Sequence, residues 1–324
     1  MNAKRFLLAL LIAGVMATTL NAQTRWSGYG RKVESATNQA ATAKVSDDSL
    51  YSMAASSSTF TPISVCPSCS TQPIGINDKG LISGGYLDAG GNSHCFLLRN
   101  GNYLTFDVPG ALFQEAGRSN APGQIAGDYV DGDGIDRPFV RNADGSLSLR
   151  RGMPGASVTY AIDINNAGDI TGSFTLDPNA AEGFTGYVMR GKNFILIFSY
   201  PGANVTSTFV LGWNEPGTIV GSFKTTTEGE EHGFVRSAQG KFKQIDYPGS
   251  VQTEAFGINA AGDIVGRYED IHGVQHGFLL RNDLFTSIDS PGPNTYAWGI
   301  NSRGEIVGWM FPDFSGPFTG FLAR

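Results

Sequence analysis

The feature that most constrains this chain is a motif, Asn-x-x-Gly-x-Ile-x-Gly, that occurs six times. The motif keeps its internal spacing in every copy, and successive copies start 43, 45, 49, 45 and 42 residues apart. A period in this range is typical of solenoids and propellers, in which each repeat is one supersecondary unit. The copies begin at Asn77, Asn120, Asn165, Asn214, Asn259 and Asn301.

Each repeat predicts four short strands. The Asn-x-x-Gly segment is typical of a hairpin turn. Asn can begin a type I turn through its side chain, and Gly can adopt the positive φ of the residue that follows the turn. In the second strand the side chains alternate in character, and the third strand carries an aromatic residue. The fourth strand ends at Pro-Gly in five copies, because proline cannot donate a hydrogen bond to a ladder. The third-strand aromatics are Phe96, Phe139, Tyr187, Phe234, Phe278 and Phe321. We expect them to form the core between repeats.

The two ends of the chain predict how the repeats are arranged. The last copy stops after three strands, at Phe321–Arg324, whereas residues 60–67 resemble the fourth strand at residues 104–110. A linear stack would need polar caps, which the sequence lacks. The sequence therefore predicts an all-β fold, a six-bladed β-propeller of four-stranded blades closed by pairing of the N-terminal strand with the C-terminal blade. A different blade count and another all-β repeat fold are the alternatives.

The chain divides into three parts. Residues 1–22 read as a signal peptide, with Lys4 and Arg5 before an apolar run too short to span a bilayer. Residues 23–59 read as a flexible spacer rich in Ser, Thr and Ala, and residues 60–324 as the propeller. Cleavage would move the net charge from −6 to −8, because it removes Lys4 and Arg5. We expect a secreted or periplasmic protein with no integral membrane segment that does not bind nucleic acid.

The cysteines predict one disulfide. An exported protein with Cys66, Cys69 and Cys95 should pair two of the three. Both Cys66–Cys69 and a pairing of one of these with Cys95 are feasible. In an antiparallel meander, the connection that holds Cys66 and Cys69 and the start of the third strand at Cys95 lie on the same face. A redox role for Cys66-Pro-Ser-Cys69 would need a helix, and no helix is predicted there.

Candidate functional residues are few, and each has a structural interpretation. Glu115 and Glu254 are acidic candidates for ligand binding, with Asp128 and Tyr129 beside them as acidic or phenolic groups. The Asn-x-x-Gly turns are uniform, which suits a scaffold, whereas the loops between second and third strands vary. We therefore expect any ligand to bind on the face that carries these variable loops, or the loops to be simply relaxed. No catalytic residues are predicted.

Histidine and aspartate residues are the candidates for metal binding. His94, His232 and His276 share one repeat position, where we expect each to bond to a neighbouring loop; they are weak ligand-binding candidates. His272 and His276 could share a metal. Asp131, Asp133 and Asp136 resemble a calcium loop, but Ile135 and Asp136 stand where an EF-hand needs an acidic or amide ligand and Gly. Calcium is thus a possible cofactor and a polar hairpin the alternative; no other cofactor is expected.

The repeat resembles a known family. Residues 257–266, followed by His276-Gly-Phe278, are similar to the HAF-type probable extracellular repeat, named for a His-Ala-Phe tripeptide. The resemblance covers residues 75–324, although Gly or Cys replaces the Ala and three copies lack the His. It implies an exported bacterial protein and no transferable catalytic residues.

These observations predict a secreted, non-catalytic propeller that serves as a binding scaffold for an extracellular glycan or protein. A hydrolase or lyase of polysaccharides and a structural surface protein are the alternatives. The sequence does not identify the ligand or the oligomeric state.

Overall fold

The structure is a computed structural model, which describes residues 59–226, 230–312 and 317–324. The expected signal peptide and all but the last residue of the expected spacer lie outside these residues. Every regular element in the described ranges is a strand. In the same ranges there is no helix long and apolar enough to cross a membrane.

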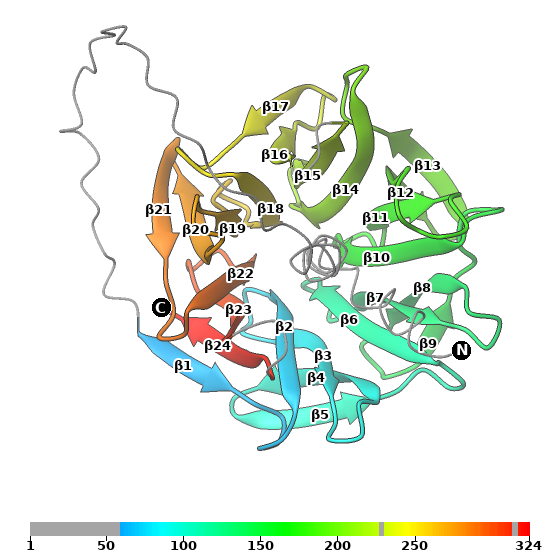
Figure 1. Cartoon of the computed structure of the whole chain (residues 1–324). Coiled ribbons are helices and arrows are strands. Elements are labelled where there is room, and N and C mark those ends of the chain that lie inside the picture. Colours follow the sequence, from blue (N-terminus) through cyan, green and yellow to red (C-terminus); the bar gives the residue numbers. More distant parts are fainter. Residues whose placement is uncertain (1–58, 227–229, 313–316) are drawn as a thin grey trace, which may run out of the picture. The chain divides into compact units, whose positions relative to one another are not determined.

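The strands form antiparallel meanders of four, each running from one strand near a common centre to one at the rim (Figure 1). We call each meander a unit. Units 1 to 3 contain β2 (Ser70–Ile76), β3 (Ile82–Leu87), β4 (Ser93–Arg99) and β5 (Asn102–Phe106); β6 (Phe113–Ser119), β7 (Ile125–Val130), β8 (Asp136–Arg141) and β9 (Leu147–Leu149); β10 (Val158–Ile164), β11 (Ile170–Thr175), β12 (Thr185–Arg190) and β13 (Asn193–Phe198). Units 4 and 5 contain β14 (Val205–Trp213), β15 (Ile219–Thr225), β16 (Glu231–Arg236) and β17 (Phe242–Ile245); β18 (Gln252–Ile258), β19 (Ile264–Glu269), β20 (Gln275–Arg281) and β21 (Leu284–Ile288).

Unit 6 takes strands from both ends of the chain. It contains β22 (Asn294–Ile300), β23 (Ile306–Phe311), β24 (Thr319–Ala323) and, from the other end, β1 (Phe60–Ile63). β1 runs antiparallel to β24, with Phe60 opposite Ala323 and Ile63 opposite Gly320. The expected pairing between the first strand and the last repeat is therefore present.

The Asn-x-x-Gly turns form for the predicted reason. The Oδ1 atom of Asn77 accepts the N–H groups of Lys79 and Leu81, and the Gly80 N–H donates to the Asn77 carbonyl at 2.9 Å. Gly80 has a φ of 74°, a conformation that costs other residues energy. The same turn recurs in each copy, so a side chain of one residue type fixes six hairpins.

The closing Gly of the motif is explained by close backbone contact. Every first strand has a β-bulge near its centre, and the closing Gly of the second strand lies opposite it. A Cβ added to Gly266 would stand 1.9 Å from the Glu254 carbonyl oxygen, and one added to Gly84 would stand 2.1 Å from that of Gln72. No other residue fits there without a shift of the backbone.

The core lies between units. The six third-strand aromatics are each 0% exposed, as predicted from the repeat. A further repeated contact, which we did not predict, ties units together at the other end of the first strand. There a Thr hydroxyl accepts a backbone N–H from the connection that precedes it, as Thr253 does from Tyr247 at 3.0 Å. The same contact is made by Thr71, Thr159, Thr208 and Thr295.

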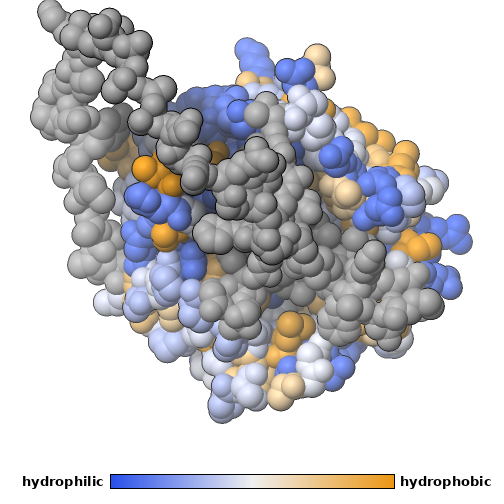
Figure 2. Space-filling model, in the orientation of Figure 1, coloured by the Kyte–Doolittle hydropathy of each residue, from blue (hydrophilic) through white to orange (hydrophobic). Residues whose placement is uncertain are grey.

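The cysteines pair in one of the two predicted ways. Cys66 and Cys69 form a disulfide directly before β2, and Cys95 is a free, buried thiol in β4. On the face seen in Figure 2, the described surface mixes hydrophilic and hydrophobic residues. The large apolar side chains that are exposed include several on the outer strands: Leu104, Leu149, Ile195, Ile197 and Leu284.

Candidate functional site

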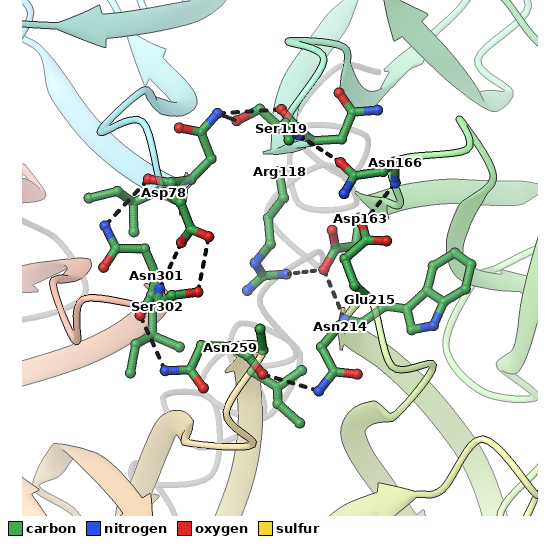
Figure 3. Close-up of a pocket in the computed structure, with 18 of the residues that line it drawn as sticks. Asp78, Arg118, Ser119, Asp163, Asn166, Asn214, Glu215, Asn259, Asn301 and Ser302 are labelled. Atoms are coloured by element: carbon green, nitrogen blue, oxygen red, sulfur yellow. Dashed lines mark hydrogen bonds and ion pairs between the residues drawn. The ribbon is translucent and has the colours of Figure 1, made fainter.

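A pocket of about 190 Å³ lies where the Asn-x-x-Gly turns of all six units meet (Figure 3). First strands are the innermost strands, so the turns that follow them converge near the centre, whereas the variable loops between second and third strands lie farther out. The pocket is thus on the face opposite the one where we expected a ligand. Its polar wall includes Asp78, Lys79, Asn166, Glu215 and Ser302.

The repeated asparagines form a chain of hydrogen bonds round this pocket. The side-chain amide of one donates to the backbone carbonyl of the Asn in the next unit. Asn259 donates to Asn301 at 3.2 Å, and Asn301 donates to Asn77 at 3.3 Å, although 224 residues separate them. Asn77, Asn120 and Asn214 make the corresponding bonds. In these five units the motif asparagine therefore both closes its own turn and joins it to the next.

The side chains that follow Asn77, Asn165 and Asn214 add a second set of contacts between units. Asp78 accepts hydrogen bonds from the backbone N–H and the hydroxyl of Ser302, at 2.8 and 3.0 Å. Glu215 accepts the Asn166 N–H at 2.8 Å, and Asn166 accepts the Ala121 N–H at 2.9 Å. These contacts hold exposed polar side chains in fixed positions round the pocket, as Figure 3 shows.

Arg118 lies across the centre of the pocket (Figure 3). Its guanidinium donates to three backbone carbonyls from three other units: Leu211, Phe256 at 2.9 Å and Trp298 at 2.6 Å. These carbonyls belong to the bulged residues of the first strands. The bulge turns the carbonyl out of the ladder, which leaves it free to accept from Arg118.

Asp163 is the acidic partner of Arg118. The two charges are 3.7 Å apart, and Asp163 also accepts the backbone N–H groups of Trp213 and Ile164. The Arg118 and Asp163 side chains are only 11% and 7% exposed. Burial raises the pKa of Asp163 to about 6 although Arg118 opposes the shift, and burial lowers the pKa of Arg118. Desolvation therefore outweighs the mutual attraction of this pair.

The sequence holds a signal for these two residues that we did not use. The residue two before the motif Asn is Gly in four copies: Gly75, Gly212, Gly257 and Gly299. It is Arg118 and Asp163 in the other two, which are adjacent. Opposite charges at the same position of neighbouring repeats indicate a pair near the axis, because equivalent positions of adjacent units face one another there.

The predicted acidic candidates lie away from this pocket and are buried. Glu115 and Asp128 are opposite one another on β6 and β7, and Asp136 begins β8. Burial raises the pKa of Glu115 to about 7 and raises those of Asp128 and Asp136 well above their usual range. One carboxyl oxygen of Asp128 and one of Asp136 have no hydrogen-bond partner. Tyr129 packs in the neighbouring apolar core.

Glu254, the second acidic candidate, lies in another interface. It forms an ion pair with Arg267, and both side chains are at most 2% exposed. The structure does not bring Glu115 and Glu254 together in one described pocket.

The predicted histidines bond as their repeat position suggested. The Nδ1 atoms of His94, His232 and His276 lie 2.9, 3.1 and 2.7 Å from Asp107, Asp246 and Asp289, which follow the fourth strands. His94 and His276 also stack on Tyr86 and Tyr268. Each histidine thus ties the end of a fourth strand to a third strand.

The predicted calcium loop is a hairpin turn. Asp131 accepts the N–H groups of Asp133 and Ile135 and pairs with Arg137, while Asp136 is buried with Glu115. Asp88 and Asp270 open the same kind of turn in other units. No group of three His, Cys, Asp or Glu side chains within the described ranges is placed to hold a metal ion.

No protein-family model matches the chain, and no curated protein does. Among solved structures it is similar to XC5397, a gluconolactonase from Xanthomonas campestris, with 14% identity over 78% of this chain and 86% of the other and a TM-score of 0.45. It is also similar to AofleA from Arthrobotrys oligospora, with 14% identity over 68% of this chain and 72% of the other and a TM-score of 0.42. A third similar structure is the six-bladed, fucose-recognising lectin of Aleuria aurantia, with 12% identity over 67% of this chain and 78% of the other and a TM-score of 0.41. The TM-scores are low, so none of these likenesses assigns a ligand or an activity to this chain.

Proposed function

We propose that the six units are the blades of a closed six-bladed β-propeller, which binds a small carbohydrate in the pocket at its axis without catalysing a reaction. The observation that carries the proposal is the convergence of polar side chains from all six units on one pocket. Its volume equals that of roughly six water molecules in the liquid. Pockets for drug-sized ligands start at about 300 Å³, so one sugar ring is the appropriate size.

The wall of the pocket suits a neutral sugar. Asn166, Glu215 and Lys79 offer an amide, a carboxylate and an ammonium group, while the half-buried side chain of Trp213 packs against the apolar core of unit 4. Sugar hydroxyls both donate and accept hydrogen bonds, so they match a set of fixed side chains that includes donors and acceptors. The contacts between units hold these groups in place before a ligand arrives, which lowers the entropic cost of binding.

One buried pair of carboxyl groups does not have the geometry of a retaining glycosidase. Glu231 and Glu254 lie within hydrogen-bonding reach of one another, whereas retaining glycosidases hold their two carboxyls about 5–5.5 Å apart. Both groups are also sealed from solvent. We further propose that the protein is an exported member of the HAF-type repeat family, which the spacing of its motifs supports.

A glycan array followed by calorimetric titration with free neutral hexoses tests the binding proposal. We expect retention on the array and Asn166→Ala to weaken it at least tenfold, while Asn102→Ala, which removes an exposed amide on β5, leaves it unchanged. Equal affinity of Asn166→Ala and the wild type, or no binding of any glycan, would overturn the proposal. Release of reducing ends from a polysaccharide, lost with Glu254→Gln, would favour the hydrolase instead.

A further inference from the structure

The sheets of units 4 and 5 merge into one at a single point. β16 and β18 run parallel there and pair at one position, Glu231 opposite Gln252. The side chains of Glu231 and Glu254 lie beside this bridge, close enough for one to donate a hydrogen bond to the other when it is protonated. They are 2% and 1% exposed, so no solvent separates the two acids.

Such a bond requires a proton. Two ionised carboxylates are acceptors only, and one of them must be protonated for a hydrogen bond to form. Around this pair, Arg267 donates through Nε to Glu254, and the Ser222 hydroxyl donates to Glu231 at 2.8 Å. The direct contact with Arg267 favours the ionised form of Glu254, so Glu231 holds the proton.

The charges that face the pair agree with one shared proton. Lys224 on β15 lies 3.7 Å from Glu231, and β19 contributes Arg267 together with Glu269, which accepts from Gln275. Tyr296 on β22 is neutral and lies under the guanidinium of Arg267. With one proton on the pair the two cations balance Glu254 and Glu269. Loss of the proton leaves one uncompensated negative charge in a dry interface.

We propose that one proton shared by Glu231 and Glu254 locks unit 4 to unit 5, and that this interface opens more readily as the shared proton is lost on raising the pH. The proposal does not depend on the ligand or on the pocket at the axis. It concerns the face of the molecule opposite the pocket, where β16 and β18 begin.

The direction of the effect follows from linkage. Burial, and then the charge of Glu254, raise the pKa of Glu231 from 4.5 to about 8. Burial alone would raise the pKa of Glu254, but Arg267 and the bond to Glu231 hold it below its usual value. A raised folded pKa gives stability that is complete below the unfolded pKa and is lost as the pH rises through the folded one. The lock therefore weakens between about pH 5 and pH 8.

Hydrogen exchange of the whole protein, followed by mass spectrometry from pH 5 to pH 8 and corrected for intrinsic rates, tests the lock. In the wild type we expect the opening equilibrium of β16 and β18 to rise by up to about tenfold per pH unit. Glu231→Gln keeps a donor for Glu254 but cannot ionise, so its opening should not depend on pH over this range. Glu115→Gln, a buried acid of unit 2, should leave the wild-type response of β16 and β18 intact.

Two results would overturn the proposal. One is pH-independent opening of β16 and β18 in the wild type, which decides the matter even if Glu231→Gln does not fold. The other is a Glu231→Gln protein that keeps the wild-type pH response.

Discussion

Arg118 shows how one departure from a repeat can bind distant parts of a chain. Its three carbonyl partners are 93, 138 and 180 residues away. Gly stands at this position in four copies because the strands crowd the axis: a Cβ on Gly257 would lie 2.5 Å from the Trp298 carbonyl oxygen. Where the side chain can point into the axis, a long cation satisfies carbonyls that the bulges leave unpaired. Arg118 thus replaces contacts that the ladder cannot make.

Arg118→Gly, the residue found in most other copies, tests this role. Removing one partner of a buried charged pair costs about 3–5 kcal/mol, because the other charge remains without compensation. We expect a loss of this size in the free energy of unfolding measured in urea. The second substitution Asp163→Asn should restore part of the loss, since it removes the stranded charge. Equal stability of Arg118→Gly and the wild type would contradict the assignment.

At the level of elements, the sequence predicted what depends on local chemistry. The Asn-x-x-Gly turns, the strand order within each unit and the buried aromatic column depend on residues close to one another in each repeat, so their pattern could be read directly. The closing Gly was visible as a repeated letter, but its cause lies in the bulge of the first strand. The Thr was also a repeated letter, but its partner is a backbone N–H group of the connection between units. A bulge has no residue signature here: the bulged residues include Ile74, Leu211 and Phe256.

The closing Gly gives a prediction for one element. In Gly266→Ala the new methyl would stand 1.9 Å from the Glu254 carbonyl oxygen, which is backbone and cannot turn aside. We expect a loss above about 3 kcal/mol, as for severe overpacking, seen as a lower melting temperature or as insoluble protein. Gly262→Ala in the preceding turn is the control. Its φ of +90° is strained but nothing lies within 4 Å, so a loss of about 1 kcal/mol is expected. Similar losses in both would refute the packing explanation.

Across the whole molecule, the pairing of the chain ends was predicted from the sequence, whereas the pocket lies on the face opposite the variable loops. β1 could be assigned because residues 60–67 repeat the pattern of a fourth strand that the last copy lacks. The face of the pocket could not, because variable loops were taken as the sign of recognition. The uniform turns approach the axis instead, and there the residues that differ between copies, Asp78, Asn166 and Glu215, project beside invariant asparagines.

The joining of the two ends carries the last prediction. Ile63 of β1 is 3% exposed and packs against Val307 of unit 6 and Ile76 and Phe96 of unit 1. Ile63→Asp places an unpaired charge in this core, so it should loosen both units although it lies in the first described strand. We expect faster hydrogen exchange in β24 and β2 and a melting temperature lowered by roughly 5–10 °C, from a loss of about 3 kcal/mol.

Thr61→Asp is the matched control, because Thr61 lies in the same short strand with its side chain exposed. It should leave exchange in β24 and β2 unchanged. Deleting residues 60–67 should produce the larger effect, since β24 then loses the backbone partner of four residues together with the side chain of Ile63. If the deleted protein melts like the full chain, β1 does not hold the last unit to the rest of the fold. The hydrogen bonds between Asn301 and Asn77 and between Ser302 and Asp78 would then be sufficient to join the last unit to the first.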